Sequence, residues 1–179
     1  WNAAKLAAGL GVSGHTVTRY RDLLTDLLLV RQLPPWTGNV RKRLIKSPKV
    51  FIRDSGLCHA LVGVADRNTL LGHPVVGGSW EGFVIENLLQ SANDLALASF
   101  YRSAVGEEID LVLESGARKI AIECRRSSAP TLDAGFFRAC EAVGVDQAFV
   151  VYLGTMRYAL RNGVEAIPLV AAMEMVRDL

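Results

Sequence analysis

The feature that most constrains this chain is a pair of short apolar segments, each carrying one acidic residue, between Glu107 and Arg126. In the first segment Ile109, Leu111 and Leu113 alternate with other residues, and this period of two predicts a strand in which the three side chains share a face. The second segment alternates in the same way after a turn that contains Gly116. The sequence therefore predicts a β-hairpin.

The acidic residues lie inside these predicted strands. Asp110 is in the first strand and Glu123 is in the second, on the same face as Arg125, because residues i and i+2 of a strand point the same way. A carboxylate among apolar neighbours needs a cation beside it. Two interpretations follow: the pair forms a site for a hard divalent metal, or it forms ion pairs with Arg125, Arg126 or Arg102 at the rim of the sheet.

The charge is distributed unevenly along the 179 residues. The net charge is +2, but residues 1–57 contain ten lysines and arginines against three acids, and the remaining residues contain ten against fifteen. This asymmetry predicts two modules, of which the first is suited to a polyanionic partner such as nucleic acid.

The cysteines and the hydropathy pattern predict a cytoplasmic protein without a membrane span. Half of the residues are hydrophobic, yet no charge-free run approaches the roughly 18 residues of a membrane-spanning helix. Cys58, Cys124 and Cys140 are scattered and form neither a metal-ligand pattern nor an even disulfide set, which indicates a reducing compartment.

The pattern of residues 3–20 resembles a helix-turn-helix. A first helix is predicted to bury Leu6 and Leu10, and Gly11 suits the left-handed turn that follows. Ser13 is placed to cap a second helix, whose apolar residues lie on one face. The residues of that face are Val17, Tyr20, Leu23 and Leu24. The outward residues, which a recognition helix would present to a groove of DNA, are His15, Thr16, Arg19 and Arg21.

A basic hairpin is predicted after the two helices. Leu27–Leu33 reads as a strand that Pro34 and Pro35 end, and Pro48–Ile52 reads as a returning strand. The loop between them carries the basic run Arg41, Lys42 and Arg43. A helix-turn-helix followed by such a hairpin resembles a winged helix. Contact with nucleic acid is one interpretation; docking on a protein, or a simply solvated basic loop, is the alternative.

The remaining residues predict a second module. Residues 54–78 read as a short helix and a connecting segment, and Ser79 is predicted to cap the next helix, with Glu81 in its first turn. The predicted boundaries are 1–60 for the first module, 61–78 for the connection and 79–179 for the second module. Its elements follow the order α-β-β-β-α-β, with strands near residues 98–102, 147–153 and 164–169 and helices near 132–143 and 170–178.

This order, with an acid on the second strand and Glu-x-Arg on the third, resembles the PD-(D/E)xK, or restriction-endonuclease-like, fold. The whole chain is similar to the C-terminal region of a large family of prokaryotic AAA-type ATPases, in which a winged helix and a nuclease-like domain of unknown function follow the ATPase domain. Four segments carry the resemblance, at residues 48–57, 78–84, 108–113 and 120–125.

The resemblance implies roles for individual residues. Asp110 and Glu123 would bind Mg²⁺, the Cys124 carbonyl would be a third ligand, and Glu81 would be an optional outer acid. Arg125 stands where the nuclease fold has a lysine. Because an arginine stays charged, it can clamp a phosphate but cannot act as a base. The resemblance therefore leaves open whether this region is an enzyme.

Three functions are compatible with the sequence. The leading one is an accessory, nucleic-acid-associated region of an ATPase, with a winged helix for docking on DNA or a partner and a degenerate nuclease-like domain. An active Mg²⁺-dependent nuclease and a protein-interaction or regulatory module are the alternatives. The segment Gly11–Thr16 lacks the lysine of a phosphate-binding loop. ATP is thus expected only in an ATPase domain outside these residues; that domain, and further copies of this chain in a homo-oligomer, are the expected protein partners.

Overall fold

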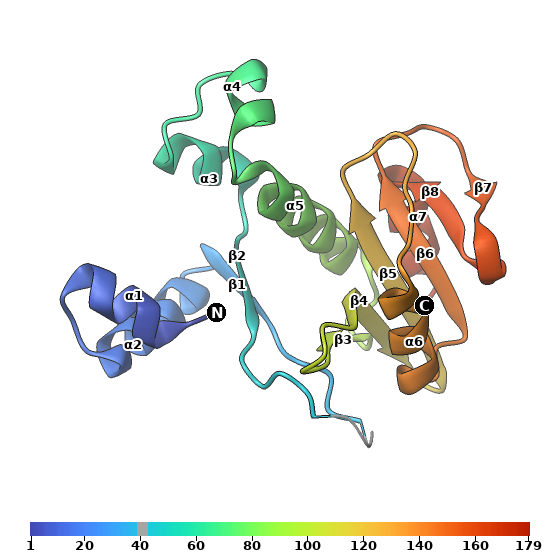
Figure 1. Ribbon diagram of the computed structural model, residues 1–179, viewed down its shortest axis with the longest axis horizontal. Helices are drawn as coiled ribbons and strands as arrows, with labels where there is room; N and C mark the ends of the chain where they lie inside the picture. Colours follow the sequence, from blue (N-terminus) through green and yellow to red (C-terminus); the bar gives the residue numbers. More distant parts are fainter. Residues whose placement is uncertain (39–42) are drawn as a thin grey trace.

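The computed structural model describes residues 1–38 and 43–179. Within these residues the chain forms seven α-helices, one 3-10 helix, a two-stranded sheet and a six-stranded mixed sheet (Figure 1). The predicted mixed α/β class is confirmed. Among the described residues, every helix is too short or too polar to cross a membrane.

The first two helices, α1 (Ala3–Leu10) and α2 (Gly14–Asp26), meet at a tight turn as the sequence predicts. Gly11 has a left-handed φ of 66°, a conformation that glycine adopts without steric cost. The Ser13 hydroxyl accepts a hydrogen bond from the Thr16 amide at 3.0 Å, which satisfies an otherwise unpaired N–H at the start of α2.

The predicted burial of Leu6 and Leu10 is wrong. These side chains are 42% and 68% exposed, and Tyr20 of α2 is 62% exposed. The buried residues of the two helices are Ala7 and Val17. Two short helices that pack on each other and on a two-stranded sheet cover only a narrow line of side chains, so the other apolar residues remain at the surface.

The two-stranded sheet consists of β1 (Val30–Leu33) and β2 (Lys49–Ile52), which pair antiparallel with Leu33 opposite Lys49. β1 begins later than predicted because Leu28 has a left-handed φ of 60° and lies in a turn. Of the predicted basic loop, Arg43 is exposed, while Arg41 and Lys42 lie outside the described residues.

The chain on either side of that loop is attached to the edge of the larger sheet. The Trp36 amide donates to the Phe100 carbonyl at 2.7 Å, and the Ile45 amide donates to the Arg102 carbonyl at 2.9 Å. Leu33 is 1% exposed and packs in the core of that sheet. The described residues on either side of the loop therefore lie along strand β3 (Leu97–Arg102) (Figure 1).

Three helices follow β2: α3 (Ser55–Leu61), α4 (Arg67–Gly72) and the long α5 (Val76–Ser91). The predicted connection at 61–78 contains α4 and the start of α5. Asp54 and Asp66 cap the two short helices through their side chains.

Ser79 does not cap α5, contrary to the prediction. The helix begins at Val76 without a side-chain cap, and the Ser79 hydroxyl instead lies 2.6 Å from Nε2 of His59 on α3. Glu81 consequently lies in the second turn of α5 rather than the first.

The six-stranded sheet has the strand order β3-β4-β5-β6-β8-β7. The first three strands are antiparallel, β5, β6 and β8 are mutually parallel, and β7 is antiparallel to β8. The remaining elements are β4 (Glu108–Ser115), β5 (Arg118–Arg125), α6 (Ala134–Val143), β6 (Gln147–Tyr152), β7 (Tyr158–Ala159), the 3-10 helix η1 (Arg161–Gly163), β8 (Glu165–Pro168) and α7 (Leu169–Arg177). The sequence predicted all of them except β7 and η1.

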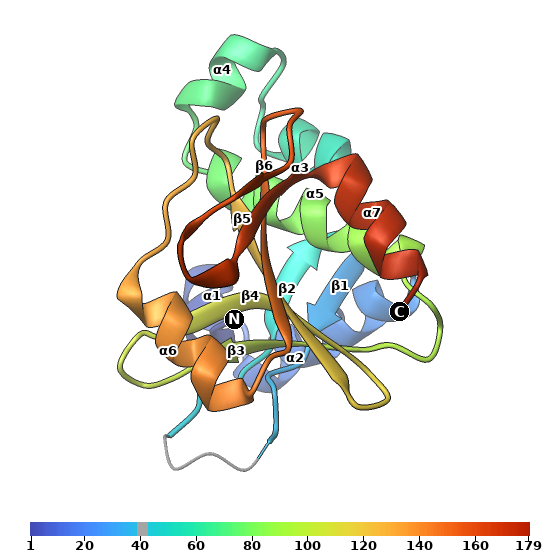
Figure 2. The same ribbon diagram turned by 90° about the vertical axis from the view of Figure 1, so that its right-hand side faces the viewer.

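Helices cover both faces of this sheet (Figure 2). On one face, α5 and α7 pack through residues such as Ile85, Leu88 and Val176. On the other face, α6 packs through Phe136 and Ala139. The central strands are buried on both sides, which explains why their apolar runs carry so few polar side chains.

A β-bulge interrupts the alternation predicted for β4. The pairing with β3 places Ser99 opposite Val112 but Tyr101 opposite Ile109, so β4 has an extra residue between them. Ile109 therefore packs with Val112 on the α6 face, whereas Leu111 lies on the α5 face. The prediction that Ile109 and Leu111 share a face is wrong, and the bulge falls at Asp110.

Candidate functional site

Strands β4 and β5 bring the two predicted acids together. Leu111 pairs with Ile122, so Asp110 and Glu123 are the next residues along the two strands. Both carboxyl groups are buried, at 8% and 5% exposure. The Cys124 amide donates to Oδ2 of Asp110 at 3.0 Å, which fixes this carboxylate against the neighbouring strand.

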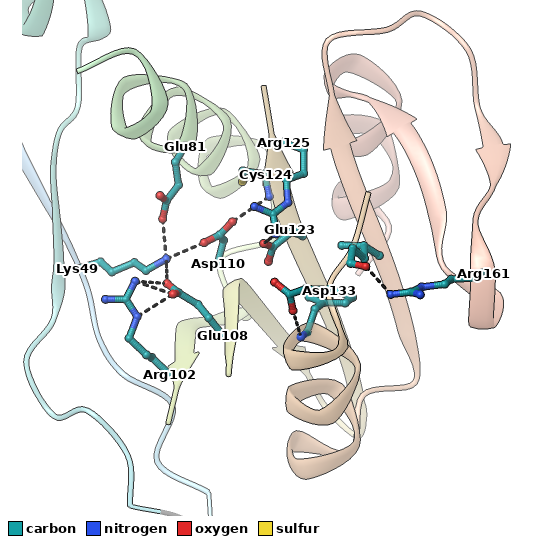
Figure 3. Close-up of polar contacts among 12 residues, drawn as sticks. Lys49, Glu81, Arg102, Glu108, Asp110, Glu123, Cys124, Arg125, Asp133 and Arg161 are labelled. Carbon is teal, nitrogen blue, oxygen red and sulfur yellow. Dashed lines mark hydrogen bonds and ion pairs between the residues drawn. The ribbon is translucent and has the colours of Figure 1, made fainter. Parts of the chain in front are cut away.

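A lysine from the two-stranded sheet lies among these acids (Figure 3). Nζ of Lys49 is 2.8 Å from Oδ1 of Asp110, 2.6 Å from Oε1 of Glu81 and 2.8 Å from Oε1 of Glu108. The three carboxylates come from β4 and α5, and the ammonium comes from β2. The ammonium group donates hydrogen bonds to Glu81 and Asp110 and forms an ion pair with Glu108.

The electrostatics of this cluster favour a charged lysine. Burial by itself would lower the pKa of Lys49, but Asp110, Glu81 and Glu108 together raise that pKa above its ordinary value. Burial and the nearby Asp110 raise the pKa of Glu81, and Lys49 opposes this rise. The cluster is therefore held together by one buried cation.

Glu123 lies beside this cluster with a different partner. Its Oε1 is 2.8 Å from a terminal nitrogen of Arg125, while Oε2 is buried and has no hydrogen-bond partner among the residues that the structure describes. Burial, and then the negative charge of Asp110, raise the pKa of Glu123 to about 9 despite the neighbouring guanidinium. At neutral pH this residue is thus expected to carry a proton.

The contact between Glu123 and Arg125 matches the interpretation of a pair at the rim of the sheet in its geometry, but the raised pKa of Glu123 predicts a protonated carboxyl group there at neutral pH. Asp110, in contrast, pairs with Lys49 and not with an arginine. Arg102 pairs with Glu108, at 2.6 Å. The sequence predicted the acids but not the lysine that neutralises them.

A second ion cluster attaches the same helix to the two-stranded sheet. Glu86 of α5 lies 2.8 Å from Arg31 of β1 and 2.6 Å from Arg53, which follows β2. Burial alone would raise the pKa of Glu86, but hydrogen bonds from Arg31, Arg53 and Gln90 lower it to about 2. Glu81 and Glu86 thus link α5 to the two-stranded sheet at two points.

The acids open into a pocket of about 430 Å³ at the carboxyl end of β5. Its walls include Trp80, Glu81, Glu123, Arg125 and Arg126. Arg125, at the position of the nuclease lysine, is partly exposed and directs its charge at Glu123. A guanidinium here can bind a phosphate, but it cannot accept a proton from water.

The acids around Lys49 are the side chains from which a divalent-metal site would have to be built. No group of three or more His, Cys, Asp or Glu side chains suited to a metal occurs in residues 1–38 and 43–179. Asp110 and Glu81 are acids of the type that hold Mg²⁺, yet the ammonium of Lys49 lies within hydrogen-bond distance of both. In this arrangement the residues do not fit a metal ion, because Lys49 already supplies the positive charge.

The residues predicted to contact nucleic acid are only partly available. His15 and Arg19 of α2 are exposed. Thr16 bonds with the Ser13 hydroxyl at 2.8 Å, and Arg21 pairs with Asp22 at 2.8 Å and lies over the Trp1 ring.

Two residues of the site, Lys49 and Glu108, were missed as site residues by sequence reasoning. The available signal was a lysine at the start of the otherwise apolar strand segment 49–52, together with a second acid two positions before Asp110. A charge at the end of an apolar strand indicates a partner, but the partner lies on another element and is not readable from local spacing.

Comparisons with known proteins identify two regions. The family described as “Domain of unknown function (DUF8612)” matches residues 1–68, and the family described as “Domain of unknown function (DUF4143)” matches residues 76–172. Uncharacterized protein Rv2008c of Mycobacterium tuberculosis and Uncharacterized protein Mb2031c of Mycobacterium bovis are each 40% identical over 170 residues, which cover 94% of this chain and 38% of the relative. The chain thus spans less than half the length of these relatives. No solved structure matches it.

Proposed function

This chain belongs to the DUF4143 family, a domain of unknown function, and from its geometry we propose that it is a nucleic-acid-associated accessory region that does not itself cleave. In this proposal the first module is a winged helix-turn-helix that docks on DNA or a partner. The second module, beginning with α5, is a degenerate restriction-endonuclease-like domain. The order α5-β3-β4-β5-α6-β6 supports this assignment.

The position of Lys49 is the main support for the proposal that this domain does not cleave nucleic acid. Its ammonium lies 2.6–2.8 Å from three carboxylates, two of which the resemblance assigns to the metal site. Glu123, the other predicted ligand, is expected to be protonated at neutral pH and lies 2.8 Å from Arg125. Two protein cations thus take the place of the metal, and neither Lys49, with its raised pKa, nor Arg125 is suited to deprotonate water.

Two surface features support an association with nucleic acid. His15 and Arg19 are exposed on α2, on the face that a recognition helix would present. Arg125 and Arg126 line the pocket at the carboxyl end of β5, where an arginine can bind phosphate oxygens in a bidentate manner. Binding through such contacts would weaken steeply with salt.

The first test is a titration with Mn²⁺ followed by calorimetry and by thermal unfolding. Wild-type protein is expected to bind Mn²⁺ weakly, because Lys49 holds the acids. Lys49→Ala leaves Asp110 and Glu81 without their cation, while Glu108 keeps Arg102, so the variant is expected to unfold at a lower temperature and to bind Mn²⁺ about tenfold more tightly or better. Added Mn²⁺ should then restore the unfolding temperature.

Two variants control this experiment. Lys49→Arg keeps the positive charge and should stay as insensitive to Mn²⁺ as the wild type. Lys5→Ala removes an exposed lysine of α1, which lies outside the cluster, and should change neither quantity. Tight Mn²⁺ binding by the wild type that Lys49→Ala does not improve would contradict the proposal.

An active Mg²⁺-dependent nuclease is the second candidate, and one observation favours it. The amine of Lys49, 2.8 Å from Asp110, supplies the lysine that Arg125 replaces along β5. This candidate predicts cleavage of labelled DNA or RNA in the presence of Mg²⁺, lost in both Lys49→Ala and Asp110→Ala. Absence of cleavage, with salt-dependent binding of the same nucleic acid, favours the accessory region.

The wider context is a further part of the proposal. The resemblance to AAA-type ATPases, and relatives of which this chain covers 38%, support a parent protein with an ATPase domain that this region assists. If neither metal nor nucleic acid binds, the remaining function is a protein-interaction or regulatory module, and the parent ATPase domain is the first partner to test.

A further inference from the structure

A second pocket lies next to the acidic one and has a different character. It measures about 320 Å³ and is formed by α3, α4, the start of α5 and the residues that follow β5 and β6. We call it the aromatic pocket and define it by Leu71, Trp80, Phe83 and Leu153, with Arg67 and Arg126 also in its wall.

The apolar residues of this pocket form an exposed platform. Phe83 is 40% exposed, Leu71 48% and Leu153 50%. The rings of Trp80 and Phe83 lie 6.1 Å apart between centroids, with their planes tilted by 34°. Since large apolar side chains gathered at a surface commonly mark a binding site, this platform is suited to a flat, apolar ligand group.

The charged residues of this pocket are free. Arg67 and Arg126 are exposed, and neither has an ion pair or hydrogen bond among the described residues. Arg102 and Arg125, in contrast, each hold a carboxylate nearby. A ligand that combines a flat ring with a negative charge therefore complements the aromatic pocket.

The two pockets share walls. Trp80 and Arg126 line both the aromatic pocket and the acidic pocket that holds Asp110 and Glu123. Both pockets lie beyond the carboxyl ends of parallel strands, where open α/β sheets commonly bind ligands. A polymer bound at one pocket would continue directly into the other.

We propose that the aromatic pocket accepts an unstacked base of single-stranded nucleic acid, with the base against Phe83 and Trp80 and the adjoining phosphates at Arg126 and Arg67. The inference rests on the proposed association with nucleic acid and specifies that the nucleic acid is single-stranded. Every base has a flat face, so stacking of this kind is tolerant of sequence, and the arginines follow the backbone. The acidic pocket then receives the next backbone segment at Arg125.

The experiment measures binding of a fluorescently labelled, short oligothymidylate to the whole chain by anisotropy, at two salt concentrations. Phe83→Ala removes a stacking ring and is expected to weaken binding by about 5- to 100-fold. Arg126→Ala is expected to weaken binding about tenfold and to reduce the salt dependence by about one phosphate contact. Quenching of tryptophan fluorescence by the oligonucleotide should be lost in Trp80→Phe while binding is retained.

Matched variants keep the test independent of folding. Leu95→Ala removes an apolar side chain that is 81% exposed and lies outside the pocket. Arg177→Ala removes an exposed arginine from the last turn of α7. Both controls should bind like the wild type. Arg126→Ala should unfold at the wild-type temperature because its side chain is exposed, and Phe83→Ala, which loses a partly covered ring beside Trp80, should remain folded at the temperature of the assay, as circular dichroism would show.

The outcomes separate this inference from the proposed function. If wild type, Phe83→Ala and Arg126→Ala bind the oligonucleotide equally, the aromatic pocket is not the binding site for a base. The proposed association with nucleic acid is then unaffected. Failure of both the single strand and a matched duplex to bind overturns both. Binding of an uncharged leucine-rich peptide that depends on Phe83 but not on Arg126, without competition by the oligonucleotide, identifies a protein-docking pocket and also overturns the inference.

Discussion

At the scale of single residues, the site is defined by which cation stands beside which acid. Lys49 holds Asp110, Glu81 and Glu108, and Arg125 holds one oxygen of Glu123. Breaking a buried pair by removing one partner is far more costly than the net stability that the pair contributes. The acids are therefore expected to depend strongly on Lys49, and Lys49→Ala tests this dependence directly.

Glu123 makes the stability of the protein depend on pH. Its pKa is raised from 4.5 to about 9, so between these values the folded protein retains a proton that the unfolded chain has lost. The free energy of unfolding then falls as pH rises through this window. Glu123→Gln cannot lose a proton, so relative to wild type it is expected to gain stability from pH 5 to pH 8.5, on the order of a few kcal/mol.

Urea unfolding at the two pH values measures this difference. Glu141→Gln, an exposed position on α6, is the control and should follow the wild type. If the free energies of unfolding of wild type and Glu123→Gln change in parallel with pH, the carboxyl group of Glu123 does not retain its proton in the folded protein.

At the scale of elements, α1 and α2 differ from an ordinary amphipathic pair. Their large apolar residues lie at the surface, and the contact between the helices is filled by small side chains. Helical periodicity located both helices correctly, but periodicity reports only which residues share a face. Whether a face is covered depends on what packs against it.

Two substitutions in these helices test the burial pattern. Val17→Ala removes methyl groups from a side chain that is 6% exposed and is expected to cost about 1–3 kcal/mol of stability. Leu10→Ala, at a side chain that is 68% exposed, is expected to change stability by less than about 0.5 kcal/mol. Chemical denaturation gives both values. A larger loss of stability for Leu10→Ala than for Val17→Ala would mean that Leu10, and not Val17, is the buried residue.

At the scale of the whole molecule, two ion clusters and a set of backbone hydrogen bonds at the edge of the larger sheet join the modules into one unit. The Lys49 cluster and the Glu86 cluster both connect α5 to the two-stranded sheet. The chain around Trp36 and Ile45 pairs with the edge of the larger sheet. The charge asymmetry of the sequence, which predicted separate modules, also supplies the basic partners for these contacts.

Glu86→Ala tests this connection. The change leaves Arg31 and Arg53, with side chains 28% and 22% exposed, without their carboxylate, and is expected to cost about 2–4 kcal/mol near neutral pH. Because the pKa of Glu86 is lowered to about 2, its contribution is complete above its ordinary value of 4.5 and is lost as pH falls from there toward 2. The difference between variant and wild type should therefore shrink in acid, as urea unfolding at pH 7 and pH 3 would show.

The sequence by itself determined the mixed α/β class, the turn at Gly11, the cap at Ser13 and the hairpin that carries Asp110 and Glu123. These features depend on neighbours a few residues apart, through the period of two in strands, the period of 3.6 in helices and the conformational freedom of glycine. Local periodicity therefore located the two acids on adjacent strands.

Only the tertiary structure decided what surrounds those acids. Lys49 reaches Asp110 from 61 residues earlier in the chain, and the bulge at Asp110 moves Ile109 to the opposite face from Leu111. Both outcomes depend on how distant strands and helices pack and on the need of a buried carboxylate for a cation. Neither the identity of that cation nor the position of a bulge is encoded in the spacing of nearby residues.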